Sequence, residues 1–254
     1  MKQPAPTQMP TTQDPPGGSR LPAWKRALDL VCCLVALPLL AVCALAGAIL
    51  MRLTSPGPLL FRQERVGYRG ERFRLYKFRT MHVSASTSTH HAHFAELLKS
   101  NVPMQKLDAK GDSRLIKGGR LLRASGLDEL PQIINVLRGD MSIVGPRPCL
   151  PYEYELYTAE QRRRMGSVPG LTGLWQVSGK NKTSFAEMVT FDIAYSQRMT
   201  LALDLKIMLL TPAVLVLQIL EARTRRASRS TQEQPSTSSC TETPFKSKVE
   251  FQRS

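Results

Sequence analysis

Two adjacent carboxylates, Asp128 and Glu129, are the residues of this sequence best suited to do chemistry. They stand just before Pro131, a residue type that is typical of a first helical turn. Ser125, three residues before Asp128, predicts a capping box at the start of that helix. The apolar residues of the stretch recur at helical spacing: Leu130, Ile133, Ile134 and Leu137. The two carboxylates are therefore predicted at the positive end of a helix dipole.

Acidic residues in a first turn often only complement the helix dipole, and this structural role is the alternative to a catalytic one. The basic side chains around the pair favour chemistry, because a helix N-terminus among arginine and lysine binds phosphate. A carboxylate there can attack phosphorus, and its neighbour can help to hold a divalent cation. Adjacent helical positions point about 100° apart, which does not suit the facing carboxyls of a glycosidase. The candidate phosphate ligands are Arg114, Arg123, Arg138 and Arg147.

The composition favours an anionic partner. The 254 residues carry a formal net charge of +15, which suits nucleic acid, an anionic membrane surface or a phosphorylated substrate. Aromatic residues make up 6% of the chain, which disfavours single-strand binding by base stacking. The five cysteines include no CxxC pair and indicate reduced thiols, not a disulfide framework or a zinc site.

An uncharged run from Leu30 to Met51 predicts a membrane anchor. As a helix it would measure ~33 Å, enough to cross a bilayer. Basic residues flank both ends, so the positive-inside tendency would keep both ends on the cytoplasmic side. Pro38 lies inside the run and predicts a kink. A re-entrant helix that enters one leaflet and returns satisfies both features, and a straight span is the alternative.

The rest of the chain divides by composition. Residues 1–22 and 222–254 are predicted to be disordered tails, the second basic and then rich in Ser and Thr. Residues 23–53 form the membrane helix, and residues 54–221 form the catalytic domain. Within that domain we expect a basic β-hairpin over 59–81, turning near Tyr68 to Gly70, and a basic helix over 114–123. The predicted fold is α+β and mainly helical, with a membrane anchor and a cytosolic catalytic domain.

Several blocks of the sequence resemble the bacterial sugar transferases, also called monotopic phosphoglycosyl transferases. These blocks are KRALDLV, TSPGPLLFRQERVG, FRLYKFRTM, SGLDELPQIINVLRGDMSIVGPRP and PGLTGLWQVSGKN, and they fall between Trp24 and Leu220. The resemblance implies transfer of a sugar 1-phosphate from a UDP-sugar to undecaprenyl phosphate, with release of UMP and a requirement for Mg²⁺. It also implies a place at the bacterial inner membrane, with the catalytic domain in the cytosol, at the start of exopolysaccharide or glycan assembly.

The resemblance assigns roles residue by residue. Asp128 matches the nucleophile that forms a covalent sugar-phosphoryl intermediate, and Glu129 matches the partner associated with Mg²⁺. Arg123 matches a phosphate-contacting residue, and Arg147 matches the arginine of a Pro-Arg-Pro motif near the nucleotide. Pro38 matches the proline that bends the re-entrant helix.

This chain departs from the family pattern at two places. Leu37 stands where relatives often have serine before the bending proline, and Ser113 stands where many have proline in an Asp-Pro-Arg motif.

Two rival functions are weighed against the enzyme. One is a membrane-anchored basic module that binds anionic lipid or nucleic acid without catalysis. The other is a metal-dependent glycosyltransferase, which the lack of any Asp-x-Asp disfavours. The enzyme interpretation predicts no nucleic-acid partner and leaves the sugar and a homo-oligomeric state open.

Overall fold

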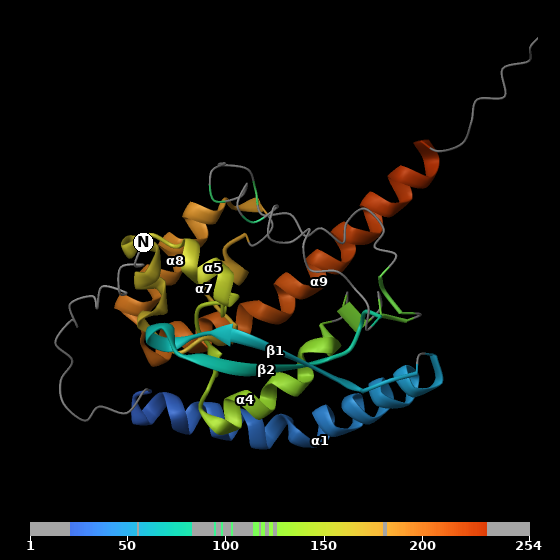
Figure 1. Ribbon diagram of the computed structural model, residues 1–254, viewed down its shortest axis with the longest axis horizontal. Coiled ribbons are helices and arrows are strands. Elements are labelled where there is room, and N and C mark those ends of the chain that lie inside the picture. The colour runs from blue at the N-terminus through green and yellow to red at the C-terminus, as the bar shows by residue number, and fades with distance from the viewer. Residues whose placement is uncertain are drawn as a thin grey trace, which may run out of the picture. The chain divides into compact units, whose positions relative to one another are not determined.

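The computed structural model describes residues 21–54, 56–82, 94, 98, 103, 114–116, 118–119, 122–123, 126–179 and 182–232. Most of the described elements are helices, and the strands form two small sheets, of which Figure 1 shows β1 and β2; this confirms the predicted mainly helical α+β class. The chain divides into a unit that ends at Val216 and a unit that begins at Leu217. The elements are α1 (Ala23–Thr54), β1 (Leu60–Val66), η1 (Tyr68–Gly70), β2 (Arg72–Phe78), η3 (Leu127–Gln132), α4 (Ile133–Arg138), β3 (Ser142–Val144), α5 (Pro151–Leu156), α6 (Ala159–Arg162), η4 (Arg163–Gly166), β4 (Gly170–Thr172), α7 (Leu174–Val177), α8 (Phe185–Arg198) and α9 (Leu201–Gln232).

Helix α1 has one face against the protein and one exposed apolar face. Cys33 and Met51 are each 1% exposed and belong to two different hydrophobic clusters of the folded unit. Within the described residues, α1 is also the one helix long and apolar enough to cross a membrane. The ribbon bends near its middle in Figure 1, and Pro38 lies inside it. Its large apolar side chains that are at least half exposed are Val31, Leu34, Val35, Leu39, Val42, Leu45, Ile49 and Leu53.

Strands β1 and β2 pair antiparallel, with Leu60 opposite Phe78 and Val66 opposite Arg72. Helix α4 lies beside the free edge of β2 (Figure 1). Asn135 closes that edge, because its side-chain amide donates to the Arg74 carbonyl (2.7 Å) and its side-chain oxygen accepts from the Tyr76 amide (3.2 Å). This satisfies backbone groups that an edge strand otherwise leaves unpaired.

The second sheet brings two sequence blocks together. Strands β3 and β4 run parallel, and the Gly145 amide donates to the Thr172 carbonyl (2.8 Å) just beyond β3. A Cβ on Gly145 would collide with the Val168 carbonyl oxygen, so only glycine permits this approach. The SIVGPRP and PGLTG blocks therefore meet because their glycines let two backbones touch.

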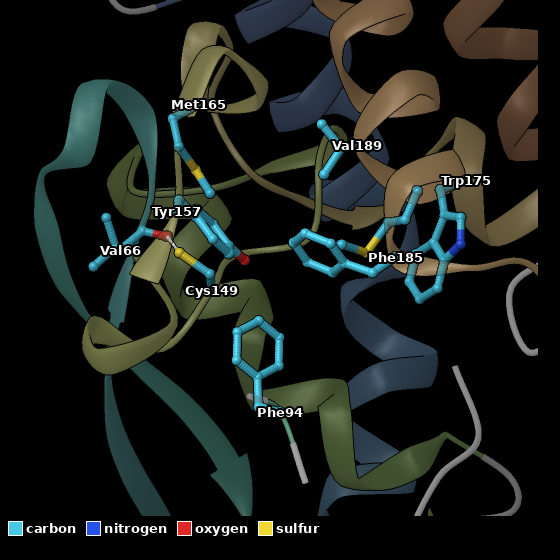
Figure 2. Close-up of a cluster of buried hydrophobic side chains, with 9 residues drawn as sticks. Val66, Phe94, Cys149, Tyr157, Met165, Trp175, Phe185 and Val189 are labelled. Carbon is cyan, nitrogen blue, oxygen red and sulfur yellow. Dashed lines mark hydrogen bonds between the residues drawn. The ribbon is translucent and has the colours of Figure 1, made fainter. Parts of the chain in front are cut away.

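The largest hydrophobic cluster among the described residues joins Val66 of β1 to side chains of α7 and α8 (Figure 2). Its rings include Phe94, Tyr157 and Phe185, with the Phe94 and Phe185 centroids 5.6 Å apart in an edge-to-face arrangement. Trp175 is 2% exposed and donates from Nε1 to Thr183 Oγ1 (2.7 Å). Trp175 is therefore a core residue.

Three boundaries differ from the sequence-based predictions. Leu115 pairs with Met81 in an isolated bridge, so the predicted helix over 114–123 is wrong in its first part. Helix α9 continues to Gln232, past the predicted tail start at 222, because residues 221–232 contain neither Gly nor Pro. Leu21 is already buried, so order begins before α1; residues 1–20, the rest of the predicted N-terminal tail, lie outside the described residues.

Candidate active site

The acidic pair lies in the first turn of η3, where the sequence predicted it. The helix begins after Gly126, whose φ of 74° is left-handed, and no side chain caps it there. The capping box predicted from Ser125 falls on a residue that lies outside the described residues, so it stays a prediction. A 3₁₀ turn carries the pair and Pro131, and the α-helix proper starts at Ile133. Gly139 (φ 84°) is left-handed and ends α4.

Asp128 and Glu129 have different surroundings. The Asp128 residue is 8% exposed, whereas the Glu129 side chain is 46% exposed. Lys77 of β2 donates from Nζ to Glu129 Oε1 (2.8 Å). The pair thus combines one partly dehydrated carboxylate with one that solvent and a cation can reach.

Packing against α1 and β2 fixes the position of η3. Leu127 and Leu130 lie against a cluster that contains Met51 of α1 and Phe78 of β2. Leu122, the residue before Arg123, belongs to the same cluster. The acidic pair, Arg123 and the C-terminal half of α1 are therefore built around one hydrophobic cluster.

Two further basic residues gather at the end of β2. Arg79 is 5% exposed, and its guanidinium lies against Gly57 of the TSPGP block, where a Cβ would come within 3.0 Å of Nη1. The segment that starts at Arg114 runs beside residues 80–82, since the His82 amide donates to the Arg114 carbonyl (2.8 Å). The ion pair with Glu129 places Lys77 at the acidic pair as well.

Arg138 and Arg147 are on other elements than the acidic pair. Arg138 ends α4, opposite the acidic pair, and donates from Nη1 to the Tyr76 hydroxyl (2.8 Å). Arg147 is exposed on the loop that follows β3. The roles of both as phosphate ligands stay predictions.

The backbone of the Pro-Arg-Pro loop is held at three consecutive carbonyls. The Gly170 amide donates to Pro146 (2.9 Å), Arg164 Nη2 donates to Arg147 (3.1 Å), and Arg65 Nη1 donates to Pro148 (3.3 Å). A surface arginine at position 147 is therefore presented from a fixed backbone.

Arg164 supports this loop from the interior, and sequence reasoning missed it. It is 1% exposed and donates from Nε and Nη2 to Asp192 Oδ2 (2.9 and 2.5 Å). Its Nη1 donates to the Tyr157 hydroxyl (2.9 Å). Burial raises the pKa of Tyr157 well above its usual range, although the Arg164 guanidinium opposes this, so the phenol stays neutral. The ion pair joins residues 28 positions apart, a separation that no local pattern reveals.

The residues of the acidic pair fit Mg²⁺ as part of a ligand set that substrate phosphates would complete. Among the described residues, no three His, Cys, Asp or Glu side chains converge on one point. Mg²⁺ is commonly held by one or two carboxylates together with substrate phosphates and water. The acidic pair supplies that donor set, with Glu129 as the accessible carboxylate. The three histidines at 90, 91 and 93 lie outside the described residues.

Comparison with known proteins identifies a family and several relatives that match this chain. The family described as bacterial sugar transferase matches residues 21–218. Galactosyl transferase CpsE of Streptococcus agalactiae is 42% identical over 197 residues, 76% of this chain and 42% of that protein. Exopolysaccharide production protein ExoY of Sinorhizobium fredii is 38% identical over 196 residues, 75% of this chain and 84% of that protein.

A third relative is named for its reaction. The UDP-glucose:undecaprenyl-phosphate glucose-1-phosphate transferase of Caulobacter vibrioides is 41% identical over 195 residues, 74% of this chain and 67% of that protein. This chain thus spans most of ExoY but less than half of the streptococcal relative. Because the family match covers the helix, both sheets and the acidic pair together, the chain belongs to the bacterial sugar transferase family.

Proposed function

We propose that this protein transfers a sugar 1-phosphate from a UDP-sugar to undecaprenyl phosphate, with Asp128 as the nucleophile. The observation that carries the proposal is the dyad itself: a nearly buried carboxylate beside an accessible one in the first turn of a helix. Relatives named for glucose-1-phosphate and galactose transfer to undecaprenyl phosphate support the substrates. The same names favour a hexose as the sugar.

The reaction takes two displacements at one phosphorus. In the first, the Asp128 carboxylate attacks the phosphorus that carries the sugar, the bond to the UMP oxygen breaks, and UMP leaves. In the second, a phosphate oxygen of undecaprenyl phosphate attacks the same phosphorus, and the carboxylate is released. The lipid diphosphate sugar then leaves. Each substrate uses the same carboxylate in turn, so the kinetics are ping-pong.

The surroundings of Asp128 and Glu129 suit the two carboxylates to different roles. Asp128 is little hydrated, so its oxygens lose less water when they attack. Glu129 and Lys77 place a carboxylate and a cation together at the edge of the site. Glu129 would hold Mg²⁺, which when bound offsets the negative charge of the phosphate oxygens. The nearby Arg123 provides positive charge for the same phosphates.

Helix α1 supplies the contact with the membrane in this proposal. Its exposed apolar face and its contact with the η3 cluster place the acidic pair beside the surface that would meet lipid. We infer a re-entrant helix at the cytosolic leaflet, because Pro38 lies inside it and Arg52 lies in its last turn. A straight span would put the two ends of α1 on opposite sides, although both ends contact the same folded unit.

The test is chemical trapping together with substitution. Full-length enzyme in detergent is incubated with UDP-glucose or UDP-galactose, without lipid acceptor, and examined by mass spectrometry for a sugar-phosphate adduct on the peptide that contains Asp128. Asp128→Asn should abolish the adduct and lower UMP release by about 10³-fold or more. Glu155→Gln, at a side chain that is 70% exposed, is the control and should change neither.

The rival binding module predicts a different result. Asp128→Asn would then leave binding to anionic vesicles unchanged, and no wild-type preparation would release UMP. Normal turnover by Asp128→Asn, or turnover without an adduct on this residue, would rule out the proposed nucleophile.

A further inference from the structure

Arg65, at the end of β1, is a buried cation without a carboxylate partner. Arg65 is 9% exposed, and none of its contacts among the described residues is an ion pair. Nη1 donates to the Pro148 carbonyl (3.3 Å), Nη2 donates to Gln63 Oε1 (2.7 Å), and Nε has no hydrogen-bond partner. A buried charge that meets only neutral acceptors is unfavourable for folding.

Arg164 shows how this protein satisfies a buried arginine whose role is structural. It lies under the same loop, and every donor group of its guanidinium has an acceptor, including Asp192. Arg65 has no equivalent of Asp192. The nearby Glu153 is committed to capping α5, where its Oε2 accepts from the Leu150 amide (2.8 Å). The contrast indicates that the counter-charge of Arg65 comes from outside the folded chain.

A second cation lies close to Arg65. Burial first, and then the positive charge of Arg147, lower the pKa of the Arg65 guanidinium to about 10, and the negative charge of Glu153, which forms no ion pair with it, offsets them only in part. Arg147 is exposed, and no carboxylate of the described residues forms an ion pair with it. Two like charges that repel each other in the free protein form a site that an anion would stabilise.

The backbone fixes this arrangement. Val66 and Cys149 exchange both backbone hydrogen bonds, from the Val66 amide to the Cys149 carbonyl (2.9 Å) and back (3.2 Å). Figure 2 shows the two residues facing one another, with the Cys149 thiol directed at the Val66 carbonyl. Arg65 and Pro148 directly precede them in sequence, so the end of β1 and the Pro-Arg-Pro loop move as one piece.

We propose that Arg65 and Arg147 form one cationic site for the diphosphate of the nucleotide sugar, in which Arg147 contacts the ligand and Arg65 supplies a second, dehydrated charge beneath the loop. The inference rests on the proposed function for the identity of the ligand. Arg65 acts as a positioning residue through the field that it adds, because a poorly hydrated charge is screened less than a surface one.

The experiment separates this role from bracing of the loop. Full-length wild type, Arg65→Gln and Arg65→Lys are compared in detergent, in thermal unfolding without nucleotide and in UDP binding by calorimetry. Arg62→Gln is the matched control, because Arg62 is on the same strand with its guanidinium exposed over the Tyr76 ring (5.9 Å to the centroid). We expect Arg62→Gln to bind UDP like wild type.

The expected results differ between charge and structure. Arg65→Gln should bind UDP at least tenfold more weakly, with a shallower dependence on salt, and should unfold without nucleotide at the same or a higher temperature. Arg65→Lys should keep UDP affinity within about threefold, since it keeps the charge. If Arg65 only braces the loop, both variants will unfold at lower temperature and lose affinity together.

Two other outcomes are decisive. If wild type and Arg65→Gln bind UDP equally, the site is wrong while the proposed function stands; a raised KM for undecaprenyl phosphate alone would likewise overturn the nucleotide assignment. If wild type does not bind UDP at all, the proposed function fails first, and this inference fails with it.

Discussion

Lys25, in the first turn of α1, is 1% exposed and forms an ion pair with Asp204 of α9, which is 0% exposed. Lys25 Nζ also donates to the Tyr195 hydroxyl (2.9 Å). That hydroxyl lies 2.7 Å from Asp204 Oδ1 and 3.1 Å from the Val144 carbonyl oxygen. The charges at the start of the apolar helix are therefore buried against α8, α9 and β3.

Lys25→Met removes the cation and leaves the Asp204 carboxylate buried with a phenol as its partner. Breaking a buried pair in this way costs about 3–5 kcal/mol of unfolding free energy. For a folded unit of this size each kcal/mol lowers Tm by roughly 2–4 °C, so Tm should fall by about 6–20 °C. The double variant Lys25→Met/Asp204→Leu should recover most of the loss, because no buried charge is left unpaired.

The assay is thermal unfolding by circular dichroism of the full chain in detergent, at one scan rate. Lys206→Met is the matched control, since Lys206 is an exposed lysine on α9 two residues from Asp204; it should change stability by no more than ~0.5 kcal/mol. Maleimide labelling of Cys33, which lies on the buried face of α1 and is 1% exposed, reports whether the helix has loosened. A loss below ~1 kcal/mol with Cys33 still protected would refute the idea that this pair attaches α1.

Three further predictions test other parts of the unit. Asp192→Asn should lower unfolding free energy by about 3–5 kcal/mol and weaken UDP binding, because Arg164 loses its carboxylate and the Arg147 carbonyl loses a fixed donor; unchanged melting would contradict it. Gly145→Ala should destabilise by more than ~2 kcal/mol, whereas Gly126→Ala, where a Cβ meets nothing within 4 Å but φ is 74°, should cost about 1 kcal/mol by urea titration. Burial raises the pKa of the Cys149 thiol to about 11, so the stability that the thiol contributes below pH 9 should be lost as pH rises towards 11. The free energy of unfolding of Cys149→Ala should fall less over that range. Iodoacetamide at pH 8 should label Cys149 only after unfolding.

Local patterns in the sequence predicted the features that local physics decides. The acidic pair lies in the first turn of a helix, as Pro131 and the spacing of the apolar residues predicted. The capping box predicted from Ser125 falls outside the described residues. The left-handed Gly126 and the 3₁₀ geometry of η3 were not predicted, because no local spacing distinguishes a 3₁₀ turn from the first turn of an α-helix.

Long-range partners explain what the sequence did not reveal. Lys25 and Arg26 were interpreted as charges that set membrane topology, yet Arg26 donates from Nη1 to Val136 (2.5 Å) and from Nη2 to Leu137 (2.6 Å), the last carbonyls of α4. Asp29 likewise accepts from the Ser142 hydroxyl and the Ile143 amide, both at 2.9 Å. The partners of Arg26 and Asp29 are more than a hundred residues away in the sequence, and hydrophobic periodicity gives no information about such contacts.

These contacts give the KRALDLV block a physical role that bears on catalysis. The first turns of α1 are fixed by Lys25, Arg26 and Asp29, and its last turns are fixed by Met51 in the cluster that also holds η3. A helix attached at both ends cannot change its depth in a bilayer without moving the acidic pair with it. If α1 is embedded as proposed, the height of Asp128 above the lipid is therefore set by packing, and a lipid phosphate arriving at headgroup level meets a carboxylate already at its depth.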